Sequence, residues 1–272
     1  MTNILELVKE IPVVIFSLNE RTKGLVKFSF ESLGFKNIVV MEENTGFANK
    51  LRVFFEMTND EKYKNHDLFI RTDADRICLP GIFDLCVKSV ERLEKRKDNF
   101  LITEGNGYEY FMEKNRGATP HIFSRACMQH CLENDDELIK NILKPESHIG
   151  QYFSRKYDAF KHYDILTNFH EFEQFPSKMY YAFLTRINRG HLSYYDVDKI
   201  LKDKYYGYPL RKAIETAQNT KETKNTMDYF DIEEDDKTLK QLDASIGTIH
   251  ESKNKEMFDN AIRVYESMVE AS

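Results

Sequence analysis

Two aspartates two residues apart form the strongest chemical signal in the sequence. The segment Thr72-Asp73-Ala74-Asp75-Arg76 closes the expected strand at 67–72. Residues two apart on an extended chain point the same way, so the two carboxylates are expected to lie close together and to repel one another unless a cation separates them. Mg²⁺ and Mn²⁺ prefer oxygen ligands, and Mg²⁺ is commonly held by one or two carboxylates together with substrate phosphates. Asp73 and Asp75 are therefore the predicted metal ligands.

Three strand–helix units in the first hundred residues are expected to position this pair. Short apolar runs are typical of strands buried on both faces, and each run is followed by a segment with helical spacing of apolar residues. The expected strands and helices alternate at 11–17, 22–33, 38–41, 47–57, 67–72 and 81–95. This order predicts an α/β fold with a doubly wound, mainly parallel sheet whose carboxyl strand ends, where ligands bind, share one edge.

The rest of the chain is expected to complete a mixed sheet and then become helical. Candidate strands at 100–103 and 108–112 flank Gly105-Asn106-Gly107, which predicts a hairpin turn, and 121–123 is a further candidate strand. From residue 124 onward the pattern is mostly helical. We expect a catalytic domain at 1–190 and a mainly helical extension at 191–272.

Composition and charge narrow the class of protein. The formal net charge of −6 argues against a protein that binds nucleic acid over its whole surface. A local basic patch that binds nucleic acid is still compatible with this charge. The four cysteines are too few and too unevenly spaced for a disulfide scaffold and are expected to be small buried side chains. Because no secretory leader and no apolar stretch of bilayer length is present, we expect a cytoplasmic protein without a transmembrane segment.

The order of strand, polar loop, helix, strand, acidic loop, helix, strand and Asp73-Ala74-Asp75 resembles the compact GT-A glycosyltransferases over about 11–174. The resemblance is one of pattern. It implies a Rossmann-like GT-A mixed sheet flanked by helices, with a helical extension at the carboxyl end. It also implies a nucleoside diphosphate sugar donor, with a UDP-sugar as the first expectation, and Mn²⁺ or Mg²⁺ as the cofactor.

The same resemblance points to residues that would contact the nucleotide. In such enzymes a polar turn after the first strand and an acidic or amide residue after the second approach the nucleotide, and the first aspartate of the pair is expected to contact it as well. A lysine near the strand ends could reach phosphate. The resulting candidates for donor binding are Ser17, Asn19, Glu42, Glu43, Asn44, Lys50 and Asp73.

Two further residues receive roles from the resemblance. Family members use a carboxylate at the start of a later helix to deprotonate the acceptor hydroxyl, and Glu146 in Pro145-Glu146-Ser147-His148-Ile149-Gly150 matches this position, with Pro145 in place of the usual second acid. Glu146 is thus the candidate general base, expected to face the same cleft as Asp75. His170, within a segment of acidic and aromatic residues, is the candidate histidine that completes the metal shell.

The mechanism and its alternatives follow from these parts. The metal would neutralise charge on the departing diphosphate while Glu146 activates the incoming hydroxyl. A nucleotidyltransferase acting on sugar phosphates and a noncatalytic GT-A-like binding module stay open as alternatives. The acceptor is likewise open among a glycan, a protein and a modified nucleobase of DNA, with the basic, tyrosine-rich stretch at 202–212 as the nearest approach to a nucleic-acid-facing patch.

Overall fold

A computed structural model of the chain describes residues 4–17, 20, 22–42, 45–109, 114–140, 142, 144–170, 175–188, 190, 192–219, 236–251 and 263. Its strands are β1 (Val13–Phe16), β2 (Ile38–Met41), β3 (Leu68–Asp73), β4 (Arg76–Cys78), β5 (Ile102–Glu109), β6 (Lys114–Ser124) and β7 (Phe160–His170). Its α-helices are α1 (Ile4–Lys9), α2 (Lys23–Ser32), α3 (Phe47–Glu56), α4 (Gly81–Leu93), α5 (Arg125–Glu133), α6 (Asp135–Leu138), α7 (Pro145–Tyr157), α8 (Pro176–Asn188), α9 (Val197–Lys202), α10 (Gly207–Asn219) and α11 (Lys237–Glu251). Short 3₁₀ turns lie at Met57–Asn59, Glu61–Tyr63 and Leu192–Tyr194.

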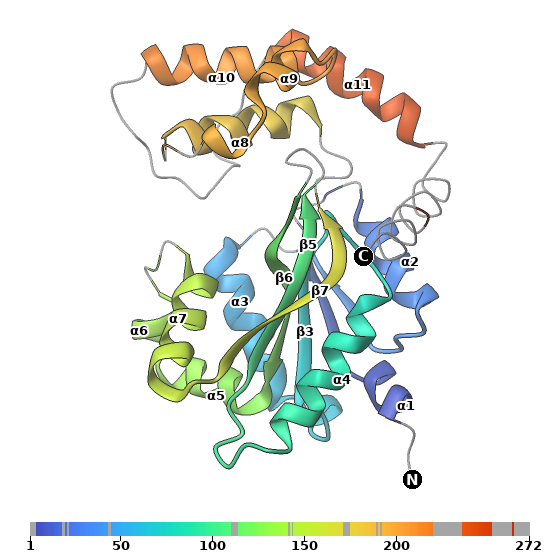
Figure 1. Cartoon of the computed structure of the whole chain (residues 1–272), viewed down its shortest axis with the longest axis vertical. Coiled ribbons are helices and arrows are strands. Elements are labelled where there is room, and N and C mark those ends of the chain that lie inside the picture. The colour runs from blue at the N-terminus through green and yellow to red at the C-terminus, as the bar shows by residue number, and fades with distance from the viewer. Residues whose placement is uncertain are drawn as a thin grey trace. The chain divides into compact units, whose positions relative to one another are not determined.

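The contacts divide the described chain into two compact units, and the first contains the whole sheet. The strand order is β2-β1-β3-β6-β5-β7-β4, with β1 parallel to both β2 and β3 and β6 antiparallel to both β3 and β5. Figure 1 shows the strands side by side with helices on either side. The predicted mixed α/β sheet flanked by helices is confirmed.

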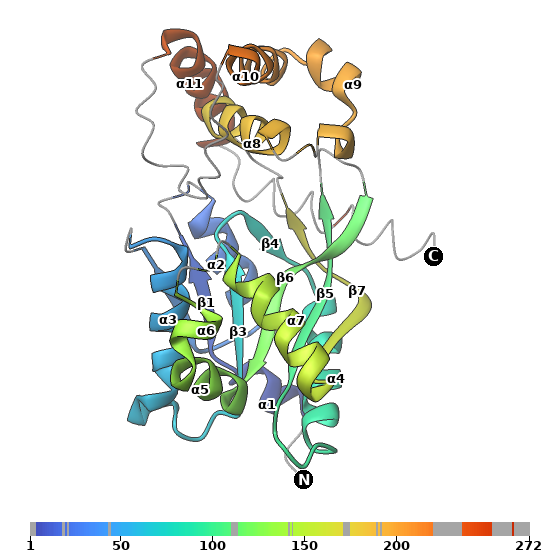
Figure 2. The same ribbon diagram turned by 90° about the vertical axis from the view of Figure 1, so that its left-hand side faces the viewer.

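Two apolar cores, one on each face of the sheet, hold the first unit together. Alternate residues of β1 point to opposite faces, as strand geometry requires: Val14 and Phe16 pack against α3, α5 and α7, whereas Val13 and Ile15 pack against α1, α2 and α4. Figure 2, turned from Figure 1, shows α3, α5, α6 and α7 on the nearer side. Because β1 is buried on both faces, its sequence is a continuous apolar run rather than an alternating one.

The structure corrects the predicted hairpin in the middle of the chain. Gly105 and Gly107 lie within β5, where each packs against β7 too closely for a side chain: an added Cβ at Gly105 would lie 2.6 Å from the Thr167 side chain, and one at Gly107 would lie 2.7 Å from Asn168 Oδ1. The glycines therefore allow a close approach of strands and do not form a turn. The expectation of helix after residue 124 missed β7, and no strand was predicted at β4.

The described residues of the second unit lie within 175–251 and are mostly helical. Its core joins α8, α9, α10 and α11 through Met179, Phe183, Ile200, Leu210 and Leu239. Helix α8 belongs to this unit, whereas the sequence analysis grouped its residues with the catalytic domain ending at 190. The functional division at 190 stays a prediction.

Other expectations concern the cysteines and the membrane. All four cysteines are buried and free, and burial raises the pKa of Cys127 to about 12, so these thiols are packing groups. Cys127 and Cys131 lie on one face of α5 within the same core, as their spacing indicated.

Within the described residues, no helix combines the length and apolar character needed to cross a lipid bilayer.

Candidate functional site

The parallel arrangement of β1, β2 and β3 brings the predicted polar residues to one edge. The register aligns Phe16 with both Met41 and Asp73, so the residues that follow β1 and β2 lie level with the end of β3. Ser17, Glu42 and Asp73 are therefore neighbours along the carboxyl edge, although they lie far apart in sequence. This edge carries the candidate site.

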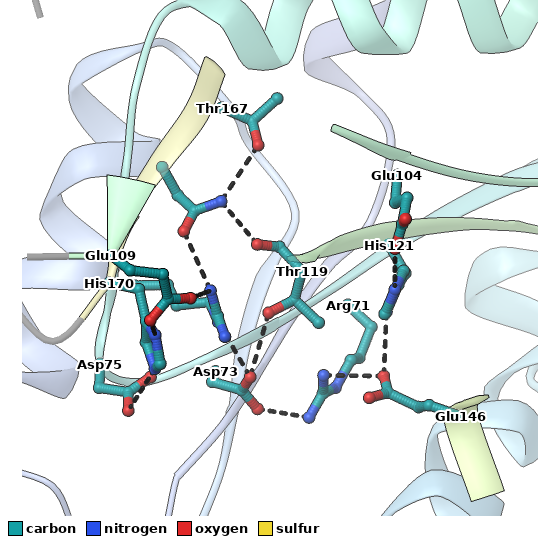
Figure 3. A network of polar contacts seen from close by, with 12 residues as sticks. Arg71, Asp73, Asp75, Glu104, Glu109, Thr119, His121, Glu146, Thr167 and His170 are labelled. Atoms are coloured by element: carbon teal, nitrogen blue, oxygen red, sulfur yellow. Dashed lines mark hydrogen bonds and ion pairs between the residues drawn. The ribbon is translucent and has the colours of Figure 1, made fainter. Parts of the chain in front are cut away.

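His170 lies between two carboxylates at the end of β7. Its Nδ1 is 2.6 Å from Glu109 Oε2, and its Nε2 is 3.3 Å from Asp75 Oδ2. Figure 3 shows the ring between these two residues. The strand register explains the contact with Glu109, since β5 pairs Glu109 with His170 of β7. Asp75 reaches the ring because the neighbouring Arg76, the first residue of β4, pairs with His170 on the other side of β7.

The charges of this trio reinforce one another. Burial raises the pKa of Glu109, but its hydrogen bond to His170 and the charges of His170, Arg76 and Arg116 outweigh burial and bring the pKa to about 2. Burial and Arg76 lower the pKa of His170, but Asp75 and Glu109 outweigh them and raise it to about 9. The trio therefore contains an imidazolium held between two carboxylates.

Two members of the trio, Asp75 and His170, have the spacing of a pair of metal ligands. A histidine that binds metal almost always donates its other N–H to a carboxylate or carbonyl, and Glu109 takes this place on Nδ1. Two adjacent ligands about 2.1–2.2 Å from a six-coordinate ion lie about 3 Å apart, close to the 3.3 Å between Nε2 and Asp75 Oδ2. Among the described residues, no group of three or more His, Cys, Asp and Glu side chains has the arrangement of a complete metal-ligand set, so the other positions would go to phosphate and water.

Asp73 has a different set of partners from Asp75. Its Oδ1 accepts a hydrogen bond from the Arg71 guanidinium, and its Oδ2 lies 3.2 Å from Arg76 Nε and 3.1 Å from Thr119 Oγ1. Both carboxyl oxygens are therefore engaged by cations or a hydroxyl. This geometry favours Asp75 and His170 as the ligand pair, and direct ligation by Asp73 stays a prediction.

Arg71 links Asp73 to Glu146. Its side chain is 1% exposed, and its guanidinium carbon lies 4.6 Å from the ring centre of Phe16 and 5.0 Å from that of Phe47. With its guanidinium between these two rings, Arg71 places Nη1 2.8 Å from Glu146 Oε1. Arg71 and Asp73 can act together because residues two apart in β3 share a face of the sheet. Nothing in the local sequence around Arg71 indicates this partnership with Glu146.

Glu146, the candidate base, also contacts His121. Its Oε1 lies 3.1 Å from His121 Nδ1, and the other ring nitrogen lies 3.1 Å from Glu104 Oε2. Burial lowers the pKa of His121, but Glu146 and Glu104 outweigh burial and raise it to about 9. Burial raises the pKa of Glu146, but Arg71 and His121 outweigh it and bring the pKa to about 2. Glu146 is therefore held ionised by two cations.

A cavity of about 540 Å³ opens beside these groups. Helix α7 contributes Glu146, Ser147, Gln151 and Ser154 to its wall, a set whose spacing follows one face of the helix. The sheet contributes Asp73, Arg76, Glu104, Thr119 and His121. Glu146 thus faces a cavity that Asp73 also lines, whereas the residue predicted to share its cleft, Asp75, is not part of the wall.

Three more of the donor-binding candidates, Ser17, Glu42 and Lys50, lie at the same edge with partners of their own. Ser17 Oγ donates to Glu20 at 2.9 Å, and the buried Lys50 ammonium donates to the Ser17 carbonyl. Glu42 forms an ion pair of 2.5 Å with Lys23. The other three candidates, Asn19, Glu43 and Asn44, lie outside the described residues.

Glu104, Glu109 and His121 are among the polar residues of the site that were not predicted from the sequence. Glu104 adjoins the predicted hairpin turn and Glu109 lies in the candidate strand at 108–112, so the predicted hairpin placed them on two different strands. A strand running through 102–109 would have carried both into the sheet. His121 was assigned to a strand, but only the pairing of His121 with Glu104 across β6 and β5 identifies its partner.

The fold and this site define a mixed α/β protein with a charged cavity beside the carboxyl ends of its parallel strands. No protein-family model matches the chain, and no curated protein matches it. One similar solved structure is a glycosyltransferase involved in the glycosylation of the major capsid of PBCV-1. The two chains are 13% identical, with a TM-score of 0.37, over 61% of this chain and 95% of that one. A TM-score below 0.5 does not establish a common fold.

Proposed function

We propose that this chain is a metal-dependent glycosyltransferase of the GT-A type. It would transfer a sugar, a hexose or a pentose, from a nucleoside diphosphate sugar to a hydroxyl acceptor, with a UDP-sugar as the first donor to test. The observation that carries the proposal is the trio of Asp75, His170 and Glu109. It supplies an oxygen ligand, a nitrogen ligand and the carboxylate that orients the nitrogen ligand, at the edge where α/β sheets bind nucleotides.

In this proposal the chain's own groups have separate tasks. Asp75 and the neutral form of His170 would hold Mn²⁺ or Mg²⁺, which when bound neutralises charge on a departing diphosphate. Arg71 orients Asp73 and Glu146 by binding both. The wall of α7 offers hydroxyl and amide groups that suit the hydroxyls of a sugar.

Glu146 would accept the proton of the acceptor hydroxyl. Its pKa of about 2 keeps it ionised and able to orient that hydroxyl, yet it also makes the carboxylate a weak base. A weak base works only if the proton moves on or transfers late, when the hydroxyl has become acidic through bond formation. The proposal therefore includes inversion of configuration at the anomeric carbon of the sugar, with Glu146 as the base.

Turnover of nucleotide sugars by the purified full chain tests the proposal. We expect release of nucleoside diphosphate from at least one donor when Mn²⁺ is present and its loss in EDTA. Asp75→Asn should lower the rate about 100-fold or more, because a neutral amide is a poor ligand for a hard ion. Asp136→Asn, which alters an exposed carboxylate paired with Lys140, is the matched control and should keep full activity.

Three outcomes would count against the proposal. Absence of release from every donor would overturn the transferase assignment. Undiminished turnover in Asp75→Asn would overturn the metal assignment. Release of pyrophosphate from a nucleoside triphosphate and a sugar phosphate would instead identify a nucleotidyltransferase.

A further inference from the structure

Three neighbouring strands carry a line of ionisable side chains that leads away from Glu146 of α7. The strand register aligns Glu104 of β5 with His121 of β6 on one side and with His162 of β7 on the other. The side chains are in contact as well: His121 Nε2 lies 3.1 Å from Glu104 Oε2, and His162 Nδ1 lies 3.2 Å from Glu104 Oε1. We call His121, Glu104 and His162 the cross-strand ladder.

The ladder runs from the cavity to the surface. At its inner end, His121 Nδ1 lies 3.1 Å from Glu146 Oε1, and the side chains of Glu146 and Glu104 are each 17% exposed. At its outer end, the His162 side chain is 41% exposed. All three separations are within or close to the range of a hydrogen bond. A proton on Glu146 therefore has a continuous chain of polar atoms leading to solvent.

Because Gly117 of β6 has no side chain, it leaves room for the contact between Glu104 and His162. A Cβ added there would lie 2.7 Å from Glu104 Oε1 and 3.3 Å from His162 Nδ1, the two atoms of the outer contact. Any larger residue at 117 would displace the Glu104 carboxylate. The absence of a side chain at this position and the alignment of the strands are two separate features that favour the same contact.

We propose that the cross-strand ladder conducts the acceptor proton from Glu146 to solvent. The inference rests on the proposed function, in which Glu146 receives that proton. An acceptor seated in the cavity would separate Glu146 from bulk water, so the proton must leave through the wall. Imidazole suits this task because it binds a proton at one nitrogen while releasing one from the other.

The proton balance closes over one turnover. His121, an imidazolium at rest, first releases its Nε2 proton to Glu104 Oε2. The neutral ring then turns over, so that its free nitrogen accepts the proton of Glu146 and the imidazolium is restored. The protonated Glu104 carboxyl group rotates and passes its proton to His162 Nδ1, and His162 releases the proton of its other nitrogen to water. Each residue ends in its starting charge state once the rings reset their protons. Arg71, the other cation beside Glu146, cannot take this role because a guanidinium does not give up its proton in proteins.

The first experiment tests the contacts of the ladder without requiring any enzymatic activity. In the full chain labelled with ¹⁵N-histidine, Glu104→Gln should shift the ring nitrogen resonances of both His121 and His162. The control Glu137→Gln removes an exposed carboxylate on α6 and should shift neither. If Glu104→Gln moves only one ring or neither ring, the ladder does not exist and the proposal is overturned.

The second experiment measures transfer to the acceptor. His162→Gln should lower kcat about 10-fold or more with the donor KM unchanged, and added imidazole should restore part of the loss. Lys161→Gln, an exposed change beside it, should have no effect. Gly117→Ala should reproduce the loss while keeping every ionisable group. Gly24→Ala is its control, because nothing lies within 4 Å of a Cβ at that position.

The outcomes separate the two proposals. A wild-type kcat in both His162→Gln and Gly117→Ala, in an active enzyme, would overturn proton conduction and leave the transferase intact. A loss in His162→Gln that imidazole does not relieve would assign the ladder a purely structural role, which also overturns the proposal. A wild-type chain inactive with every donor would overturn the proposed function and the proton path with it, whatever the histidine resonances show.

Discussion

Replacement of His121 by glutamine should remove one pH dependence of stability from the first unit. In the fold, Glu146 and Glu104 outweigh the effect of burial and raise the pKa of His121 from the ordinary value of 6.5 to about 9. At about 1.4 kcal/mol for each pH unit, this difference corresponds to about 3 kcal/mol. The side chain is only 13% exposed, so solvent screening reduces the figure little.

The direction of the effect follows from the raised pKa. A group that binds its proton more tightly in the fold than in the unfolded chain stabilises the fold fully below pH 6.5. That contribution is lost as the pH rises through about 9. Glu146 stays ionised throughout this window because its pKa is about 2. His170, whose pKa is also raised to about 9, contributes a loss of its own in both proteins. The wild type should therefore lose about 3 kcal/mol more than His121→Gln between pH 6 and pH 9.5.

Urea unfolding at pH 6 and pH 9.5 provides the measurement. The chain has two compact units, so hydrogen exchange of peptides from β6 and α7 should report the first unit separately. His130→Gln is the matched control: it removes a histidine on α5 that contacts Tyr152 instead of a carboxylate, and it should keep the wild-type loss. An equal loss of stability in His121→Gln and the wild type would refute the reasoning.

Three further predictions concern other parts of the first unit. Arg71→Met should destabilise it by about 3–5 kcal/mol in urea unfolding, because two carboxylates lose a buried cation, and a loss below about 1 kcal/mol would contradict this. The same change should raise the pKa of Glu146. In the wild type, the stabilisation from ionised Glu146 is lost only as the pH falls from 4.5 towards 2, and in Arg71→Met it should be lost at higher pH, which unfolding measured over an acid pH series would show. Glu109→Gln should weaken Mn²⁺ binding about 10- to 100-fold in calorimetry, since His170 would lose the carboxylate that orients it, whereas unchanged affinity would remove Glu109 from the metal site. Phe54→Ala should cost about 3–5 kcal/mol, because its fully buried ring contacts four other aromatic rings, and a near-neutral effect would show that this core can collapse around the gap.

The early part of the fold was predictable because its signals are local. The run 11–16 is apolar throughout because β1 is buried on both faces. Gly34, with a positive φ of 88°, ends the helix α2 that follows. Parallel pairing then determines that the ends of β1, β2 and β3 meet. Local pattern failed at Gly105 and Gly107, where glycine serves a close approach between strands, and in β7, whose first half is partly exposed and lacks an apolar run.

By itself, the sequence determined that Asp73 ends a buried strand and that Asp75 follows it in the turn at the carboxyl end of that strand. Only the tertiary structure decided which residues complete the site. Glu109 and His170 are separated by 61 positions and meet through the register of β5 and β7, and His121 meets Glu104 and Glu146 from three different elements. Such partners depend on how strands align and where a bulge shifts them, and alignment is set by packing over the whole sheet. The identity of a side chain can be read locally, but the charges that face it cannot.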